Sequence, residues 1–383
     1  MKTNKLLLIG LISCSLVACG GNENNISSSS NSTATNVSSS TESVQTTYEN
    51  PVWEPILADP SIIRDENGVW YAFGTEDSAD WGSQGYGKKI GPILESRDLV
   101  NWDCVGSVFK MANSPTWSES IGAGLWAPDI QYVNGQYVLY YSLSLWGDPN
   151  PGIGVATAPH PKGPWTDKGK LFTSNEIGVT NSIDASVFVD DDGRVYMMWG
   201  SFCGIYGVEL SSDGLSLKGG IEYARDNKVL IAGYQTTQWS GDQYEGAFLR
   251  KINDYYYVFL SLGTCCNGYS STYHVRVARS TSPLGNYVQS DGQSMIGGGN
   301  KGTLVLDKSS RFVGVGHNAL TQDDAGDWWI VYHGFDKKQP DKLGTTNRRA
   351  LLIDKLLWTE DGWPYVKDYQ ASTTSDVPYV IIK

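Results

Sequence analysis

The sequence is poor in cysteine, and none of its cysteines has the spacing of a metal site. Of six cysteines in 383 residues, Cys14 and Cys19 lie near the N-terminus. The other four show no CxxC pair that would indicate a zinc site or a redox motif; they are Cys104, Cys203, Cys265 and Cys266. Adjacent cysteines rarely bond to each other, so we expect Cys265 and Cys266 to be packed or to line a site without forming a disulfide.

Positive charge is also scarce. Lys and Arg total 29 against 41 Asp and Glu, which gives a formal net charge of −12 and a pI near 4.8. An acidic surface repels the phosphates of a nucleic acid, so the composition argues against a nucleic-acid partner. The composition does not exclude neutral or cationic ligands.

The N-terminal apolar stretch is too short to cross a bilayer. Lys2 and Lys5 precede apolar residues 6–18, a pattern typical of an export signal. The tetrad LVAC that ends at Cys19 resembles a bacterial lipobox, in which the chain is cleaved before the cysteine and its sulfur is acylated. We therefore expect a lipoprotein signal peptide at 1–18 and a lipid anchor on Cys19. The alternative is an ordinary signal peptide with an incidental cysteine.

Residues 19–47 are almost devoid of apolar side chains and rich in Ser, Thr and Asn. Such a segment cannot bury enough surface to offset the entropy of ordering it, so we expect a flexible tether. The folded domain is expected to span residues 48–383.

Helical periodicity is scarce in this domain, whereas aromatic residues are abundant, with 14 Trp and 22 Tyr. Short runs of strand-forming residues alternate with Gly, Asn and Asp turns, and five of these strand–turn–strand units resemble one another. Their turn residues lie 67, 58, 61 and 72 positions apart; they are Gly68, Gly135, Gly193, Asp254 and Gly326. This spacing suits one four-stranded sheet per unit and predicts an all-β, five-bladed β-propeller. A pair of β-sandwiches is the alternative, but its strands would not recur with so long a period.

The repeat also aligns titratable residues. In four units the residue nine positions before the turn is Asp59, Asp184, Glu245 or His317. Because the innermost strands of a propeller run along its central channel, equivalent positions on different blades should converge on the axis.

The second unit has a shorter turn and an Ala in this position. Its neighbour Trp126 is expected to be an aromatic platform for a ligand, and Asp129 to bond backbone groups in a structural role.

Three converging carboxyl groups suit glycoside hydrolysis. One carboxylic acid protonates the leaving oxygen, one carboxylate activates water or attacks, and a third can raise the pKa of the proton donor. The alternative is that each acid caps a strand end or binds solvent.

The domain resembles glycoside hydrolase family 43, the five-bladed propeller enzymes, and is most similar to their endo-1,5-α-L-arabinanase branch. The matching stretches are ADPSII, ESRDLVNW, LWAPDI, YYSLSLWG, IGVATA, NSIDASVF, YEGAFL, SLGTCCNG and GVGHNAL. The resemblance implies that Asp59 is the general base, Glu245 the general acid and Asp184 the residue that tunes Glu245. It also implies inversion at the anomeric carbon, with carboxyl groups about 6.5–9.5 Å apart. Cys265 and Cys266 are expected to line the substrate site.

The resemblance further implies a calcium ion in the central channel, held with several waters by His317. Calcium prefers oxygen ligands, so one imidazole makes an atypical site. The alternative is a neutral His317 bonded to the backbone.

Together these features predict an exported bacterial lipoprotein that cleaves internal α-1,5-L-arabinofuranosyl linkages of arabinan, as in pectin side chains. We expect a monomer that meets the membrane only through its lipid anchor, at the cell surface or the periplasmic face of the outer membrane. The alternatives are an exo-acting arabinanase, an arabinofuranosidase or β-xylosidase of the same family, or a glycan-binding propeller without turnover.

Overall fold

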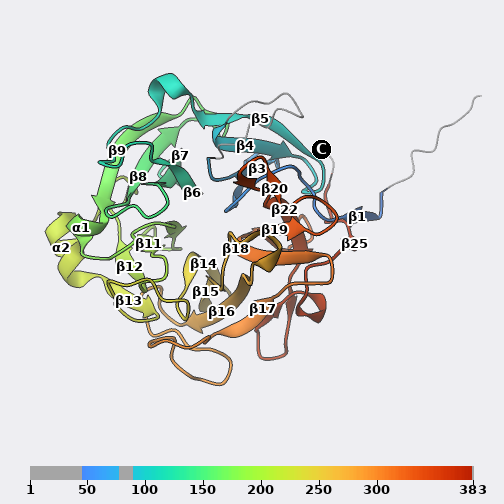
Figure 1. The fold of residues 1–383 in the computed structure, drawn as a ribbon. Helices are drawn as coiled ribbons and strands as arrows, with labels where there is room; N and C mark the ends of the chain where they lie inside the picture. Colours follow the sequence, from blue (N-terminus) through green and yellow to red (C-terminus); the bar gives the residue numbers. More distant parts are fainter. Residues whose placement is uncertain (1–44, 77–88, 382–383) are drawn as a thin grey trace, which may run out of the picture. The chain divides into compact units, whose positions relative to one another are not determined.

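The computed structural model describes residues 45–76 and 89–381. In this part of the chain, strands are arranged as five sheets around a central axis (Figure 1). The predicted five-bladed β-propeller is confirmed. The expected signal peptide, Cys19 and most of the tether lie outside the described residues.

The first four blades are four-stranded antiparallel sheets in simple sequence order. Blade 1 contains β2 (Ser61–Arg64), β3 (Trp70–Phe73), β4 (Ile90–Ser96) and β5 (Trp102–Phe109). Blade 2 contains β6 (Gly124–Val133), β7 (Gln136–Ser144), β8 (Gly152–Ala158) and β9 (Thr166–Thr173). Blade 3 contains β10 (Ser186–Val189), β11 (Val195–Trp199), β12 (Ile205–Glu209) and β13 (Val229–Ala232). Blade 4 contains β14 (Glu245–Ile252), β15 (Tyr255–Leu262), β16 (His274–Ser280) and β17 (Thr303–Leu306).

Blade 5 departs from this pattern, because its sheet has three named strands, β18 (Phe312–Gln322), β19 (Trp328–Asp336) and β22 (Ala350–Lys355). The segment before blade 1 lies against the free edge of β22, where Trp53 forms an antiparallel bridge with Leu351. The two ends of the propeller domain thus close the ring together, which covers an edge that would otherwise be open.

The remaining elements are short strand pairs and short helices outside the five sheets. The pairs are β1 (Thr47–Glu49) with β25 (Thr374–Asp376), β20 (Lys342–Leu343) with β21 (Thr346–Asn347), and β23 (Leu357–Trp358) with β24 (Pro364–Tyr365). The helices are α1 (Ser174–Ile177) and α2 (Gly220–Asn227), with 3-10 turns η2 (Met111–Asn113), η3 (Gly268–Ser270) and η4 (Lys367–Tyr369). No helix in the described residues is long and apolar enough to cross a membrane. Because β1 begins at Thr47, the folded domain starts one residue before the predicted boundary.

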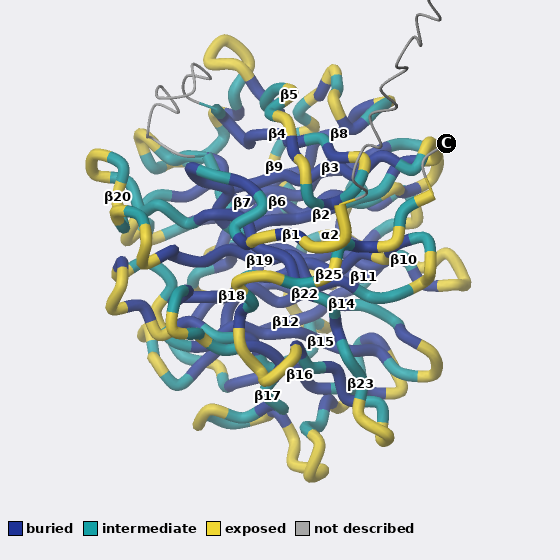
Figure 2. The backbone as a smooth tube through the Cα atoms, turned by 90° about the vertical axis from the view of Figure 1, so that its right-hand side faces the viewer, coloured by how far each residue is buried: buried dark blue, intermediate teal, exposed yellow. Residues whose placement is uncertain are grey.

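The hydrophobic cores lie between neighbouring blades. Side chains alternate across each strand, so adjacent residues enter different cores. On β7, Tyr140 packs toward blade 3 and Tyr141 toward blade 1; on β15, Phe259 packs toward blade 5 and Leu260 toward blade 3. Buried backbone accordingly follows the strands, while the exposed residues lie in the connecting loops (Figure 2). The blades pack as wedges, which fixes the inner strands around the axis.

Candidate active site

Each blade has one residue with left-handed backbone near the start of its inner strand. These residues are Asp59, Ala127, Asp184, Gly246 and His317, with φ values between 40° and 61°. Their N–H groups donate to side chains of the preceding blade, respectively His333, Thr75, Ser142, Asp184 and Ser261. A left-handed backbone costs about 1–2 kcal/mol for a residue other than glycine. These inter-blade hydrogen bonds hold it in place and gather the five positions at one end of the channel.

Asp59 lies in an electropositive environment. Its Oδ1 accepts a hydrogen bond from Nη1 of Arg349 over 2.7 Å, and its Oδ2 accepts one from the hydroxyl of Thr75 over 2.6 Å. The Nδ1 atoms of His317 and His333 lie 3.4 and 3.3 Å from Oδ1. Burial alone would raise the pKa of Asp59, but the charge of Arg349 and the hydrogen bond from Thr75 hold it well below its ordinary value. Asp59 is therefore a carboxylate at any pH near neutrality.

Asp184 and Glu245 form a buried pair with the opposite tendency. The N–H of Gly246, directly after Glu245, donates to Oδ2 of Asp184 over 3.2 Å. Burial and the negative charges of Glu245 and Asp59 raise the pKa of Asp184. Burial raises the pKa of Glu245 to about 7, although the Ser201 hydroxyl donates to its Oε2 over 2.8 Å and favours the ionised form. Two negative charges in one buried site are costly, so the pair keeps a proton near neutral pH.

His317 lies beside Asp59 and against the backbone of Gly246. Burial lowers the pKa of His317, so its imidazole is neutral at neutral pH. A β-carbon on Gly246 would lie 3.1 Å from Nδ1 of His317, and only glycine permits this approach without displacement. Residues 45–76 and 89–381 contain no group of three His, Cys, Asp or Glu side chains that could hold a metal ion. A metal beside His317 would take most of its ligands from water, which fits only the hydrated ion expected from the sequence.

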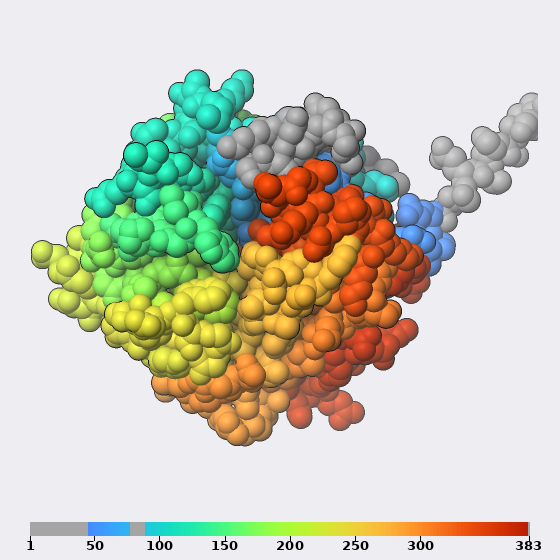
Figure 3. All heavy atoms as spheres, viewed as in Figure 1, coloured from blue at the N-terminus to red at the C-terminus, as the bar shows by residue number. Residues whose placement is uncertain are grey.

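These groups open into a cleft of about 880 Å³ that receives residues from all five blades. It includes Asp59, Asp184, Glu245 and His317, and three indoles line it, those of Trp126, Trp146 and Trp239. Figure 3 shows the face on which segments from different blades meet around a central hollow. The cleft thus combines an ionised carboxylate, a pair of carboxyl groups that keeps a proton, and aromatic walls. This combination suits acid–base chemistry on a sugar chain.

The family model of the glycosyl hydrolases family 43 matches residues 48–364. The chain belongs to glycosyl hydrolase family 43. It is 33% identical over 325 residues to the extracellular exo-α-(1→5)-L-arabinofuranosidase ArbA of Cellvibrio japonicus, with 81% of this chain and 86% of that protein covered. It is also 33% identical over 316 residues to the extracellular endo-α-(1→5)-L-arabinanase 1 of Bacillus subtilis, with 81% and 87% covered.

Solved structures of family 43 enzymes match the same domain. The α-L-arabinanase of Cellvibrio cellulosa in complex with arabinohexaose superposes with a TM-score of 0.68 at 31% identity, covering 82% of this chain and 96% of that one. The family 43 endo-arabinanase of Bacillus licheniformis gives a TM-score of 0.66 at 29% identity, covering 82% and 98%. The relatives thus include both endo- and exo-acting enzymes.

The predicted position of Glu245 in the repeat was wrong by one residue. The turn at 253–254 has only two residues, as does the turn at 134–135 in the second unit. The alignment of the fourth unit must therefore be shifted by one residue, as it was for the second. Gly246 occupies the left-handed position, and Glu245 precedes it at the place of Trp126. Glu245 pairs with Ser261, as Trp126 pairs with Ser142, before a bulge in each strand.

The expectation for the adjacent cysteines was wrong in part. Cys265 and Cys266 form a disulfide with each other, and both line the cleft. Such a bond needs only a suitable local conformation, and the loop after β15 is held by hydrogen bonds. The N–H of Thr264 donates to Oγ1 of Thr272, and the side chain of Asn347 donates to the carbonyl of Cys266. Cys203 is a buried free thiol and Cys104 a partly buried one.

Asp129 has the structural role predicted for it. Its carboxylate accepts hydrogen bonds from the hydroxyl of Ser61 and the N–H of Val187, so it connects blades 1, 2 and 3. Burial raises the pKa of Asp129 to about 6. It lies below the cleft and does not line it.

Several site residues were not identified from the sequence: Thr75, Ser201, His333 and Arg349. Thr75, Ser201 and His333 lie in or just after the second strand of their unit, at a nearly constant offset from the turn. Ser142 and Ser261 lie at the same offset in the other two units. That recurrence of small hydroxyl residues was the available signal. Arg349 lies outside the repeated strand–turn–strand units and had none.

Proposed function

We propose that this chain is an inverting endo-1,5-α-L-arabinanase that cleaves internal α-1,5-L-arabinofuranosyl linkages of arabinan. The observation that carries the proposal is that one cleft holds Asp59, hydrogen-bonded to Arg349, together with the buried pair of Asp184 and Glu245. Inverting hydrolysis needs a base that is ionised and an acid that is protonated at the same pH. The arabinanase names of the relatives support the choice of substrate.

In this mechanism the ionised Asp59 takes a proton from a water molecule as that water attacks the anomeric carbon. Glu245 donates its proton to the glycosidic oxygen as the bond to the leaving chain breaks. Asp184 forms with Glu245 the buried pair that keeps a proton near neutral pH, and it orients the strand by accepting the N–H of Gly246. Arg349 keeps Asp59 ionised and in place.

Proton NMR of the first product formed from linear arabinan tests the stereochemistry. Inversion of an α-linked substrate requires the β-anomer of the new reducing end before mutarotation. The variants Asp59→Asn and Glu245→Gln should remain folded and lose hydrolysis, while Asp191→Asn, an exposed acid paired with Lys251, should act as the wild type. An initial α-anomer, or normal activity in both active-site variants, would disprove the mechanism.

We further propose endo action, because exposed indoles from separate loops line the cleft, which suits a substrate chain that extends beyond the bond that breaks. Trp146 is 73% exposed and Trp239 is 58% exposed, although both line the cleft. The exo-acting relative makes exo action the second candidate. Product profiles on linear arabinan, branched arabinan and xylan distinguish them: a spread of early oligosaccharides indicates endo action, and one small product indicates exo action.

A hydrated calcium ion beside His317 is also part of the proposal. With Nδ1–H directed at Asp59, Nε2 of His317 would be the protein ligand and water would supply the others. Such an ion would supply positive charge near the base. Calorimetric titration of chelator-treated protein with calcium should show binding that is lost in His317→Ala, and equal binding by this variant would refute the site.

We propose that the protein is exported and anchored through Cys19 as a monomer. The extracellular relatives support export, and the Cys265–Cys266 disulfide suits an oxidising compartment. Metabolic labelling with palmitate in a bacterial host should mark the wild type and not Cys19→Ala. Light scattering of a soluble form that begins at residue 20 should give the monomer mass.

A further inference from the structure

A second cavity lies at the other end of the propeller channel. Its volume is about 540 Å³, and it is lined by the same inner strands three to five residues beyond the positions that form the active site. In blade 1, for example, Asp59, two residues before β2, lines the cleft, whereas Arg64 at the end of β2 lines the second cavity. At about 3.3 Å per residue, these offsets place it about 10–16 Å further along the axis.

Hydrogen-bonded side chains lie between the two openings. The hydroxyl of Ser61 donates to the carboxylate of Asp129 and accepts the N–H of Ile130. The carboxylate of Asp129 also accepts the N–H of Val187. No described residue lines both cavities. A ligand in the second cavity would therefore not touch the catalytic carboxyl groups.

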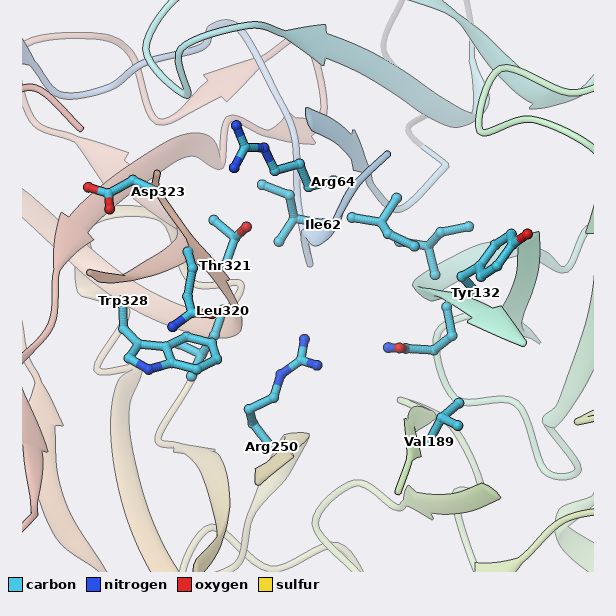
Figure 4. A pocket seen from close by; sticks show the side chains of 13 residues that line it. Ile62, Arg64, Tyr132, Val189, Arg250, Leu320, Thr321, Asp323 and Trp328 are labelled. Carbon is cyan, nitrogen blue, oxygen red and sulfur yellow. The ribbon is translucent and has the colours of Figure 1, made fainter. Parts of the chain in front are cut away.

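Arg250 is the distinctive group of this cavity. It extends from β14, and Figure 4 shows its guanidinium pointing into the centre of the opening. Its Nε is buried without a hydrogen-bond partner, and no ion pair joins Arg250 to any described residue. Asp129 interacts electrostatically with the guanidinium of Arg250. The carboxylate of Asp129, however, already accepts hydrogen bonds from Ser61, Gln131 and Val187. The guanidinium carbon of Arg250 also lies 5.5 Å from the ring centroid of Phe248. A partly buried guanidinium without a hydrogen bond or an ion pair is costly, which favours a bound anion.

The other charged side chains of the wall have partners. Arg64 pairs with Asp324 at 2.8 Å. Asp323 accepts hydrogen bonds from two backbone N–H groups of its own turn and from the indole of Trp329. Arg250 is therefore the charged side chain of the described wall that has neither a hydrogen bond nor an ion pair to a described residue.

The rest of the wall suits a sugar ring better than a bare ion. The cavity is far larger than a single small anion, and its volume lies in the range of ligand sites. Trp328 presents a partly exposed indole on one side and Tyr132 a phenol on the other (Figure 4), while Gln131 and Gln322 add carboxamides. Aromatic faces pack against the C–H face of a sugar, carboxamides bond hydroxyl groups, and a guanidinium binds carboxylate.

We propose that this cavity is a binding site for a sugar carboxylate, a hexuronate, with Arg250 as its anchor. The site would let the enzyme hold an acidic sugar on the face opposite the active site. Binding there does not depend on the catalytic groups.

Isothermal titration calorimetry and saturation-transfer NMR with galacturonate as the probe test this site in the full-length protein. The wild type and Glu245→Gln should bind galacturonate equally, and neutral galactose should not bind at the same concentration. Arg250→Met should weaken binding at least about tenfold, because it removes the charge-assisted hydrogen bonds while keeping the length of the side chain. The matched control Arg225→Met changes an exposed arginine of α2 and should bind as the wild type.

Retained arabinan hydrolysis in Arg250→Met would show that this variant is folded. Equal galacturonate binding by Arg250→Met, or equal binding of galactose, would overturn the proposal. Loss of binding in Glu245→Gln would place the probe in the catalytic cleft and would overturn it as well. If inorganic phosphate binds as tightly and displaces galacturonate, the cavity is a general anion site and the hexuronate assignment is wrong.

Discussion

Nη1 of Arg349 lies 2.7 Å from Oδ1 of Asp59, so the guanidinium holds the proposed base in its ionised form. Removing this charge in Arg349→Met should raise the pKa of Asp59. We expect the acid limb of the kcat/KM profile on linear arabinan to move upward by about 1–3 pH units. The neighbouring Arg348 pairs with Glu54 at 3.3 Å and provides the control, because Arg348→Met should leave that limb unchanged. An acid limb that coincides in Arg349→Met and wild type would show that Arg349 does not act on Asp59.

Glu245 should set the basic limb of the same profile. Its raised pKa of about 7 means that activity is lost as the pH rises above about 7, where the proton donor is ionised. Glu245→Gln should lower kcat by about 10²- to 10⁴-fold, because a general acid contributes about that much. A basic limb far from pH 7 would contradict this assignment.

The same pKa makes Glu245 a stability probe. The folded state binds the proton more tightly than the unfolded state, so this group's contribution to the free energy of unfolding is full below its ordinary pKa and falls as the pH rises toward 7. Glu245→Gln carries no titrating group at this position. Its free energy of unfolding, taken relative to that of the wild type, should therefore be higher at pH 8 than at pH 5. Chemical denaturation at the two pH values measures the difference. Glu222→Gln, which changes an exposed carboxylate on α2, is the matched control.

The convergence of Asp59, Asp184 and His317 could be predicted from sequence because it depends only on the period of the repeat. Equivalent positions of repeated strands must meet at a common axis. Glu245 was aligned one residue away from its true position, because the two-residue turn at 253–254 shortens the fourth unit. The prediction still placed it in the cleft, since the bulge at Gly246 leaves room for it.

The remaining features depend on contacts between segments that the repeat does not connect. Arg349 lies near the start of the last strand of blade 5, and its reach to Asp59 follows from closure of the ring. The Cys265–Cys266 bond depends on the conformation of one loop. The three-stranded fifth blade, completed by the segment around Trp53, likewise follows from how the two ends of the domain meet.

Closure of the ring should depend on Asn50. This side chain is 1% exposed, and it satisfies both the N–H and the carbonyl of Ile353 on β22. Asn50→Ala would leave the buried N–H of Ile353 without a partner and its carbonyl with the Tyr48 hydroxyl alone. We therefore expect the free energy of unfolding to fall by about 1–3 kcal/mol. Activity below the unfolding transition should stay near that of the wild type. Gln45→Ala, an exposed change in the same segment, should have little effect, and equal stability of the two variants would argue against this closure.

Trp146 and Trp239 should bind the substrate chain away from the bond that breaks. Trp146 lies in the loop after β7, and Trp239 packs on Phe202 with ring centroids 4.3 Å apart before β14. Each Trp→Ala change should raise KM for linear arabinan by about tenfold, because it removes one stacking surface. Hydrolysis of a short aryl arabinofuranoside should change little, since that substrate does not reach both indoles. Tyr223→Ala, an exposed aromatic change on α2, is the control. If the two Trp variants reduce kcat on both substrates alike, the indoles shape the catalytic centre instead of extending the binding surface.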